Sequence, residues 1–249
     1  MALRAYDWIE YHAATTPNKR AMYDLASGRD FSYSDMNDRV ARVAGMLRDK
    51  GVKPGDRVAF LCLNTSDVME IIFGCWRVGA VCLALNFRLT PPELAYILND
   101  SEASLVLVDA PFAPVAEATK NLTSVDCWVN TDGVGGASEY EAALAATTPI
   151  YDYHPQNLED QCLLMYSSGT TGSPKGVIIT HAMLDFTSSS AVRLGASSPV
   201  GATGIRMMLD AYKQTTNQAE NMQVEGAKTV GTYNVGGSGT TNVSFVVGV

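Results

Sequence analysis

Short apolar segments and amphipathic helical stretches follow one another along the chain from residue 5 to residue 166, separated by brief links. Strands are expected at residues 20–23, 58–63, 80–85, 104–108, 125–129 and 162–166. Helices are expected at residues 5–14, 34–50, 66–78, 112–119 and 139–146, and from Thr90 onward. Strands that alternate with helices in this way run parallel and are joined by right-handed crossovers. The pattern therefore predicts an α/β fold with a doubly wound, mostly parallel sheet.

The expected helix starts depend on local capping signals. Ser34 and Ser66 are candidate N-caps, because a side-chain oxygen at that position accepts a hydrogen bond from the first helical turn. Thr90 and Glu93 form a capping-box pattern, with two prolines at the first helical positions between them. These signals set where the helices begin along the chain.

A loop rich in glycine and hydroxyl groups follows the strand expected at residues 162–166. Its glycines allow backbone N–H groups to approach an anion, its Ser and Thr side chains add donors, and Lys175 adds a positive charge. The spacing does not fit the Walker pattern, because Lys175 follows a proline and no Ser or Thr comes after it. An ordinary surface turn has a similar composition. In a doubly wound sheet, however, ligands bind at the carboxyl ends of strands, where this loop falls.

The amino-acid composition limits the kinds of molecule that the chain is expected to bind. The net charge of −8 and pI near 4.8, without a block of Lys or Arg, argue against a nucleic-acid or anionic-membrane surface. No signal peptide and no membrane span are predicted. The five cysteines lie mostly in apolar runs and are expected to be buried free thiols. The three histidines are scattered, so we assign no catalytic residue and no metal site.

The run SSGTTGSPKGVIITH at residues 167–181 resembles the phosphate-binding signature of the adenylate-forming superfamily, which includes the acyl-CoA synthetases. The resemblance extends over residues 1–185 and predicts a truncated AMP-binding domain there. It implies ATP with Mg²⁺, CoA and a small carboxylate as cofactors and substrates. It also implies that a set of loop residues grips the β and γ phosphates, namely Ser167, Ser168, Gly169, Thr170, Thr171, Gly172 and Lys175. The family's adenine, ribose and catalytic-lysine motifs are not found in this sequence.

Residues 199–249 have a different character, with an expected helix at residues 205–212 and an expected hairpin whose turn is at residues 236–239. Its motifs PVGATG, QVEGAKTV and NVGGSGTTNVSFVVG resemble the carboxyl end of thiolases of the sterol-carrier-protein type. Ser198 and Asn234 stand where that family has a histidine and, in many members, a cysteine, so thiolase catalysis is not expected. Residues 186–198 are interpreted as a junction between the two resemblances.

The combined interpretation is a fragment of an AMP-forming acyl-CoA synthetase that keeps the phosphate-binding loop and is inactive alone. Two alternatives stay open: a non-catalytic nucleotide- or pyrophosphate-binding remnant or interaction protein, and a thiolase-like acyltransferase subunit. A cytoplasmic location is expected, with an organellar one left open. The sequence does not specify the acyl substrate or the oligomeric state.

Overall fold

The computed structural model describes residues 5–25, 27–167, 174–185, 229–235 and 242–248. The chain divides into two compact units, Met1–Ala182 and Met183–Val249, and each is considered by itself.

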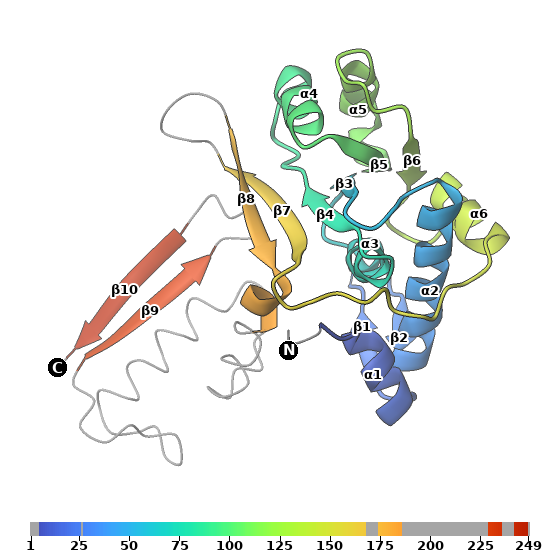
Figure 1. The fold of residues 1–249 in the computed structure, drawn as a ribbon, viewed down its shortest axis with the longest axis vertical. Helices are drawn as coiled ribbons and strands as arrows, with labels where there is room; N and C mark the ends of the chain where they lie inside the picture. The colour runs from blue at the N-terminus through green and yellow to red at the C-terminus, as the bar shows by residue number, and fades with distance from the viewer. Residues whose placement is uncertain (1–4, 26, 168–173, 186–228, 236–241, 249) are drawn as a thin grey trace. The chain divides into compact units, whose positions relative to one another are not determined.

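The first unit is built on a six-stranded sheet in the order β6-β5-β3-β4-β7-β8 (Figure 1). Its strands are β3 (Arg57–Leu61), β4 (Val81–Ala84), β5 (Ala103–Asp109), β6 (Trp128–Thr131), β7 (Gln161–Ser167) and β8 (Lys175–Thr180). Neighbouring strands run parallel from β6 to β7, and β8 pairs antiparallel with β7 at one edge. Two further strands, β1 (Arg20–Tyr23) and β2 (Asp30–Ser32), form a separate antiparallel pair. The prediction of an α/β fold with a mostly parallel sheet is confirmed.

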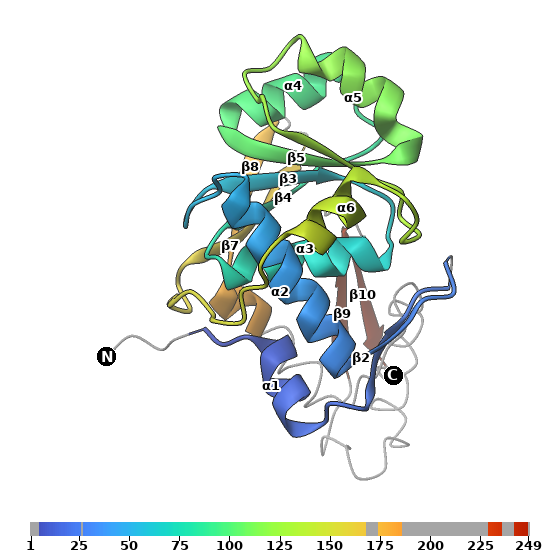
Figure 2. The same cartoon turned by 90° about the vertical axis from the view of Figure 1, so that its right-hand side faces the viewer.

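Helices cover both faces of this sheet, as Figure 2 shows. One face carries α4 (Pro91–Asp100) and α5 (Ala113–Lys120), with a short 3-10 helix η1 (Ala110–Phe112) before α5. The other face carries α2 (Tyr33–Asp49), α3 (Ser66–Arg77) and α6 (Glu139–Ala146), and α1 (Trp8–Thr15) packs against α2. The central strands are buried on both faces, as parallel strands under two helical layers must be.

Two of the three predicted helix starts need correction. The N-cap of helix α2 is Ser32, two residues before the predicted Ser34, and it forms a capping box with Asp35. Helix α3 has Thr65 as its N-cap, and the Ser66 hydroxyl instead donates to Asp24 at 3.1 Å. The capping box of α4 is present as predicted, with the Thr90 amide donating to Glu93 at 2.8 Å.

Strand β6 begins later than the predicted residues 125–129. Asn99, in α4, binds the preceding segment: its Oδ1 accepts from the Thr123 hydroxyl at 2.8 Å and from the Ser124 amide at 3.1 Å. The Trp128 indole also donates back to the Val125 carbonyl at 2.7 Å. Residues 123–125 thus bond to Asn99 and Trp128 and stay outside the sheet, and the register with β5 starts at Trp128.

The apolar side chains of α3 are buried to different extents: Cys75 and Trp76 are buried, whereas Met69 is exposed. Trp76 is buried on α3, and its indole donates to the Cys162 carbonyl at 2.9 Å. The cysteines are free thiols; Cys75, Cys82 and Cys162 are buried, and Cys62 and Cys127 are partly buried. Burial raises the pKa of the Cys162 thiol to about 12, so this group is a neutral thiol at physiological pH.

In the second unit, β9 (Thr229–Val235) and β10 (Asn242–Gly248) pair antiparallel in an unbroken register from Asn242–Val235 to Gly248–Thr229. This is the strand pairing that the sequence predicts for the tail. The helix expected at residues 205–212 lies outside the described residues. Throughout the described ranges, no helix combines the length and the apolar character needed to cross a bilayer.

Candidate functional site

The loop predicted to bind phosphate rises from the antiparallel pair of β7 and β8. Six register pairs join these strands, and the last two are Tyr166 with Gly176 and Ser167 with Lys175. Strand β7 confirms the strand predicted at residues 162–166 before the loop, and β8 follows the loop. The loop therefore leaves the sheet through a paired stem with a fixed register at its base.

The structure brings two of the predicted site residues together at this base. Ser167 is the last residue of β7 and is partly exposed, while Lys175 is the exposed first residue of β8. Their Cα atoms are register partners, so a hydroxyl-bearing residue and the cationic residue face each other across the stem. The remaining predicted site residues lie outside the described part of the chain: Ser168, Gly169, Thr170, Thr171 and Gly172.

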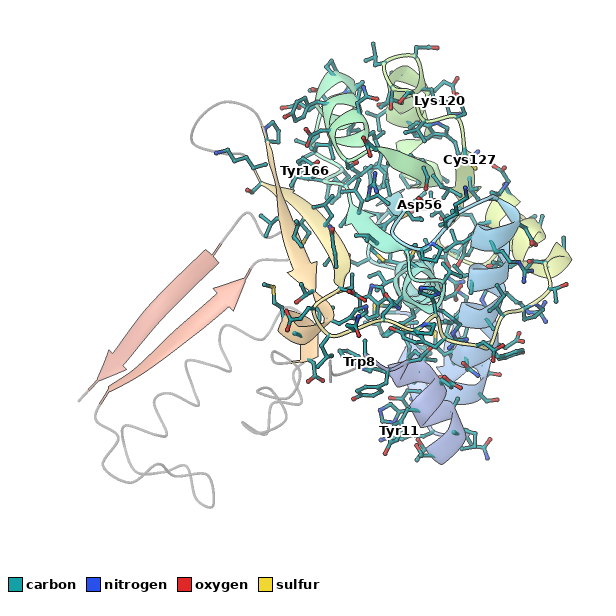
Figure 3. The ribbon with its side chains drawn as sticks, viewed as in Figure 1. Trp8, Tyr11, Asp56, Lys120, Cys127 and Tyr166 are labelled. Atoms are coloured by element: carbon teal, nitrogen blue, oxygen red, sulfur yellow. The ribbon has the colours of Figure 1, made fainter. Side chains whose placement is uncertain are left out.

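Tyr166, in the stem, is hydrogen-bonded to a residue of helix α4. The Tyr166 hydroxyl donates to Asp100 Oδ2 at 2.5 Å, and Asp100 is the last residue of α4. Burial and this bond to the carboxylate both raise the pKa of the Tyr166 phenol, so it stays a protonated donor. Figure 3 labels Tyr166 at the end of β7. Sequence reasoning missed this contact, because nothing in the local pattern links the two positions.

The same carboxyl edge of the sheet carries the loop after β4. Phe87 stacks on Phe112 with ring centroids 5.4 Å apart, and the Arg88 guanidinium lies 5.0 Å from the centroid of the Phe87 ring. Phe87 and Arg88 are both exposed. Because Ala84 and Met165 are register partners, this loop begins on the strand beside β7. The edge thus presents aromatic and cationic side chains as well as the stem.

His181, the last residue of the resemblance motif, has a packing role. It is buried, its Nε2 lies 3.1 Å from Gln156 Oε1, and its ring meets Trp76 edge to face at 5.4 Å. Burial lowers the pKa of His181 below its ordinary value, which favours the neutral ring.

A buried network of charges lies on the opposite helical layer, between α2, α3 and α6. Arg39 makes two bonds to Glu141, at 2.6 and 2.7 Å, and one to Glu70 at 2.7 Å. The Tyr140 hydroxyl donates to the same Glu70 oxygen at 2.9 Å. The other Glu70 oxygen, Oε1, is buried and has no hydrogen-bond partner among the described residues. Burial raises the pKa of Glu70 despite its bonds to Arg39.

We expect Glu70→Gln to flatten the pH dependence of stability. A carboxyl whose pKa is raised by folding stabilises the folded state fully below its unfolded pKa, near 4.5, and loses that contribution as pH rises through the folded value. The amide does not titrate, so urea midpoints measured from pH 4.5 upward should fall less steeply in the variant than in the wild type. Glu117→Gln, at an exposed position on α5, is the control and should keep the wild-type slope.

No group of three or more His, Cys, Asp or Glu side chains in the described ranges is arranged to hold a metal ion. Asp109, at the end of β5, is buried; its Oδ1 accepts from the Ala110 amide at 2.9 Å and its Oδ2 from the Leu63 amide at 3.4 Å. Ser167 and Lys175 can supply a hydroxyl group and a positive charge to an anion at this edge of the sheet. The Asp109 carboxylate instead accepts hydrogen bonds from backbone amides.

Comparison with known proteins decides the family. A sequence profile described as "AMP-binding enzyme" matches residues 9–208, most of the chain. The chain belongs to the AMP-binding enzyme family. The resemblance to acyl-CoA synthetases, stated above from the loop motif, is supported by this match and by the relatives described next.

Two relatives within the AMP-binding enzyme family are named as a CoA synthase and a CoA ligase. The chain is 38% identical over 179 residues to a feruloyl-CoA synthase of Amycolatopsis sp, covering 71% of this chain and 33% of that protein. It is 32% identical over 186 residues to the long-chain-fatty-acid–CoA ligase FadD13 of Mycobacterium tuberculosis, covering 73% of this chain and 36% of that protein. The chain spans about a third of the length of these AMP-binding enzymes.

Solved structures of AMP-binding enzymes share the fold. The anthranilate CoA ligase AuaEII in complex with anthranoyl-AMP superposes with a TM-score of 0.68 at 27% identity, covering 76% of this chain and 36% of that one. The inhibitor-bound N-terminal domain of FACL13 from Mycobacterium tuberculosis superposes with a TM-score of 0.64 at 30% identity, covering 72% of this chain and 45% of that one.

Proposed function

We propose that this chain is a polyphosphate-binding portion of an AMP-forming acid–thiol ligase, and that it binds ATP and pyrophosphate through the β7–β8 loop. The observation that carries the proposal is the stem. It sets Ser167 opposite Lys175 at the carboxyl edge of a parallel sheet, within a segment that matches the AMP-binding family. Ligand binding at that edge is the general rule for open α/β sheets.

The chemistry assigned to the loop follows from its donors. In the complete reaction a carboxylate and ATP give an acyl-adenylate and pyrophosphate, and the acyl group is then transferred to CoA. Lys175 would offset the charge of the β and γ phosphates and of the departing pyrophosphate, and the loop hydroxyls and amides would donate to their oxygens. Ser167, Ser168, Gly169, Thr170, Thr171 and Gly172 complete this proposed set. Mg²⁺ would neutralise further phosphate charge.

We propose further that the chain alone does not complete this reaction. Its span of about a third of the length of its relatives supports this part of the proposal. The acyl group stays open, since the relatives' names range from feruloyl to long-chain fatty acyl. ATP–pyrophosphate exchange driven by an aryl or fatty acid, and abolished by Lys175→Ala, would contradict this part of the proposal.

We expect Lys175→Ala to weaken pyrophosphate binding by about tenfold or more, because a hydrogen bond to a charged group contributes about 1.5–3 kcal/mol. Titration calorimetry with pyrophosphate and with ATP measures the effect. Lys53→Ala is the matched control, since Lys53 is an exposed lysine in the turn before β3 and should leave affinity unchanged. Absence of heat with both ligands in the wild-type chain would rule out phosphate binding and leave an inert fragment.

For residues 199–249 we propose a thiolase-like terminal segment without catalysis. The antiparallel pairing of β9 and β10 is the observation that favours it. Because Ser198 and Asn234 provide neither a base nor a thiolate, the chain should not cleave acetoacetyl-CoA, and such cleavage in a spectrophotometric assay would contradict this assignment.

A further inference from the structure

Tyr166 joins three elements at the base of the stem. Its hydroxyl reaches Asp100 at the end of α4, and its ring packs against the core cluster that includes Leu94 and Leu98 of the same helix. Across the stem its register partner is Gly176. A Cβ added at Gly176 would lie 3.4 Å from the Tyr166 ring carbon Cζ, which is van der Waals contact, and a tighter 3.1 Å from Leu164, so the ring lies directly beside Gly176.

Few side chains of strand β8 are buried, so burial does little to fix the register of this strand. Lys175, Gly176, Val177 and Ile178 are all exposed, on both faces of the strand. Register is specified strongly where one face of a strand is buried and weakly where neither is. The pairing of β7 with β8 is also irregular at its far end, between Gln161 and Leu163. The register at the loop end therefore needs a local contact to fix it.

We infer that Tyr166, anchored by Asp100, is a positioning residue that fixes the register of β8 and so places Lys175 for a bound polyphosphate. The inference rests on the proposed function, since it assigns a role within the same loop. A slip of one residue would turn the Lys175 side chain to the opposite face of the sheet, because side chains alternate along a strand. The ring over Gly176 opposes that slip, and the bond to Asp100 holds the ring.

The protonated phenol suits this role. Tyr166 donates to a carboxylate, and bonds to ionised partners are shorter and stronger than neutral ones. Arg57 and Tyr96 also act electrostatically on Tyr166, with opposite effects on its pKa: Tyr96 raises it and Arg57 lowers it. The anchoring bond thus persists throughout the neutral pH range in which ATP binding would be measured.

The test compares Tyr166→Phe, Asp100→Asn and their combination with the wild type. Calorimetric titration with pyrophosphate should show affinity reduced roughly fivefold in each single variant, the loss expected for one net hydrogen bond. The double variant should lose no more than either single one, because both changes remove the same bond. Amide hydrogen exchange at Lys175 and Val177 should quicken by a similar factor. Tyr151→Phe is the matched control, since Tyr151 donates to Asp38 at 2.8 Å away from the stem, and it should change neither readout.

The possible outcomes distinguish a failure of the proposed phosphate binding from a failure of the proposed role of Tyr166. Failure of the wild-type chain to bind pyrophosphate would overturn the proposed function. Binding by the wild type with unchanged affinity in Tyr166→Phe would overturn the positioning role alone. A variant whose melting temperature falls while its affinity and its exchange at Lys175 stay at wild-type values would likewise show a merely structural tyrosine.

Discussion

Replacement of Arg77 by methionine is expected to lower the free energy of unfolding by about 3–5 kcal/mol, the cost of leaving one member of a buried ion pair without its partner. The side chains of Arg77 and Asp7 are 0% and 2% exposed. Arg77 donates to Asp7 Oδ2 from Nε at 2.8 Å and from Nη2 at 2.5 Å. It also donates to the backbone and side-chain oxygens of Asn37.

Methionine fills similar volume but donates no hydrogen bond, so the Asp7 carboxylate would stay buried without its counter-charge. Asp7 also caps α1, accepting from the Ile9 amide at 2.9 Å, which ties it to the site. Chemical denaturation with urea measures the loss. Arg48→Met removes an exposed pair with Asp49, whose side chains are 51% and 50% exposed, and should change stability by less than about 1 kcal/mol. Equal losses in the two variants would contradict the argument from burial.

The second large effect is expected from Gly74→Ala in α3. Glycine in an exposed helix interior is usually less favourable than alanine by about 0.5–1 kcal/mol, so the change would ordinarily stabilise. Here the new methyl group would fall on the side chain of Val43 in α2, with Val43 Cβ only 2.7 Å away. Val43 is fully buried and, being β-branched, has little rotamer freedom with which to move. We therefore expect a loss of about 1–3 kcal/mol, the usual cost of overpacking a core.

A double-mutant cycle with Val43→Ala tests this explanation. Truncation of Val43 removes Cγ1, the atom nearest to the new methyl group, while Cβ stays, so the double variant should recover part of the loss and be more stable than the sum of the single losses predicts. The midpoint of thermal or urea unfolding provides each value. Strict additivity would show that the cost of Gly74→Ala arises somewhere other than the contact between α2 and α3.

Much of the fold could be predicted because the spacing of apolar residues and the residue types indicate the same secondary structure for most segments of the first unit. Strands such as β3 and β5 are continuous apolar runs, and the helices between them carry one apolar face, so type and order follow directly. Boundaries were harder to predict. Ser32 and Ser34 are both acceptable caps by type, and only the bond between Ser32 and Asp35 decides between them. Such a choice depends on geometry that spacing does not encode.

Only part of the candidate site could be predicted from the sequence, because the loop has a local motif and the contacts of its stem do not. A phosphate-binding loop can be recognised from a short run of the sequence, here from its glycines, its Ser and Thr residues and Lys175. The contacts that hold its stem join residues far apart in sequence, as with Tyr166 and Asp100, and leave no periodic signal. The same is true of the ion pair between Arg39 and Glu70. Long-range polar pairs are the part of a fold that single-sequence patterns do not reveal.

The place of β7 in the sheet has a consequence for the order in which a nascent chain assembles. Strands β3 to β6 and their helices leave the ribosome before β7, whose partner β4 was made much earlier, as the Cα partners Cys82 and Leu163 show. Contacts that close so long a span form slowly. Until Gln161–Ser167 emerges, the edge of β4 has no strand beside it, so we expect the stem to be the last part of the sheet to assemble and the growing chain to be most prone to association just before then.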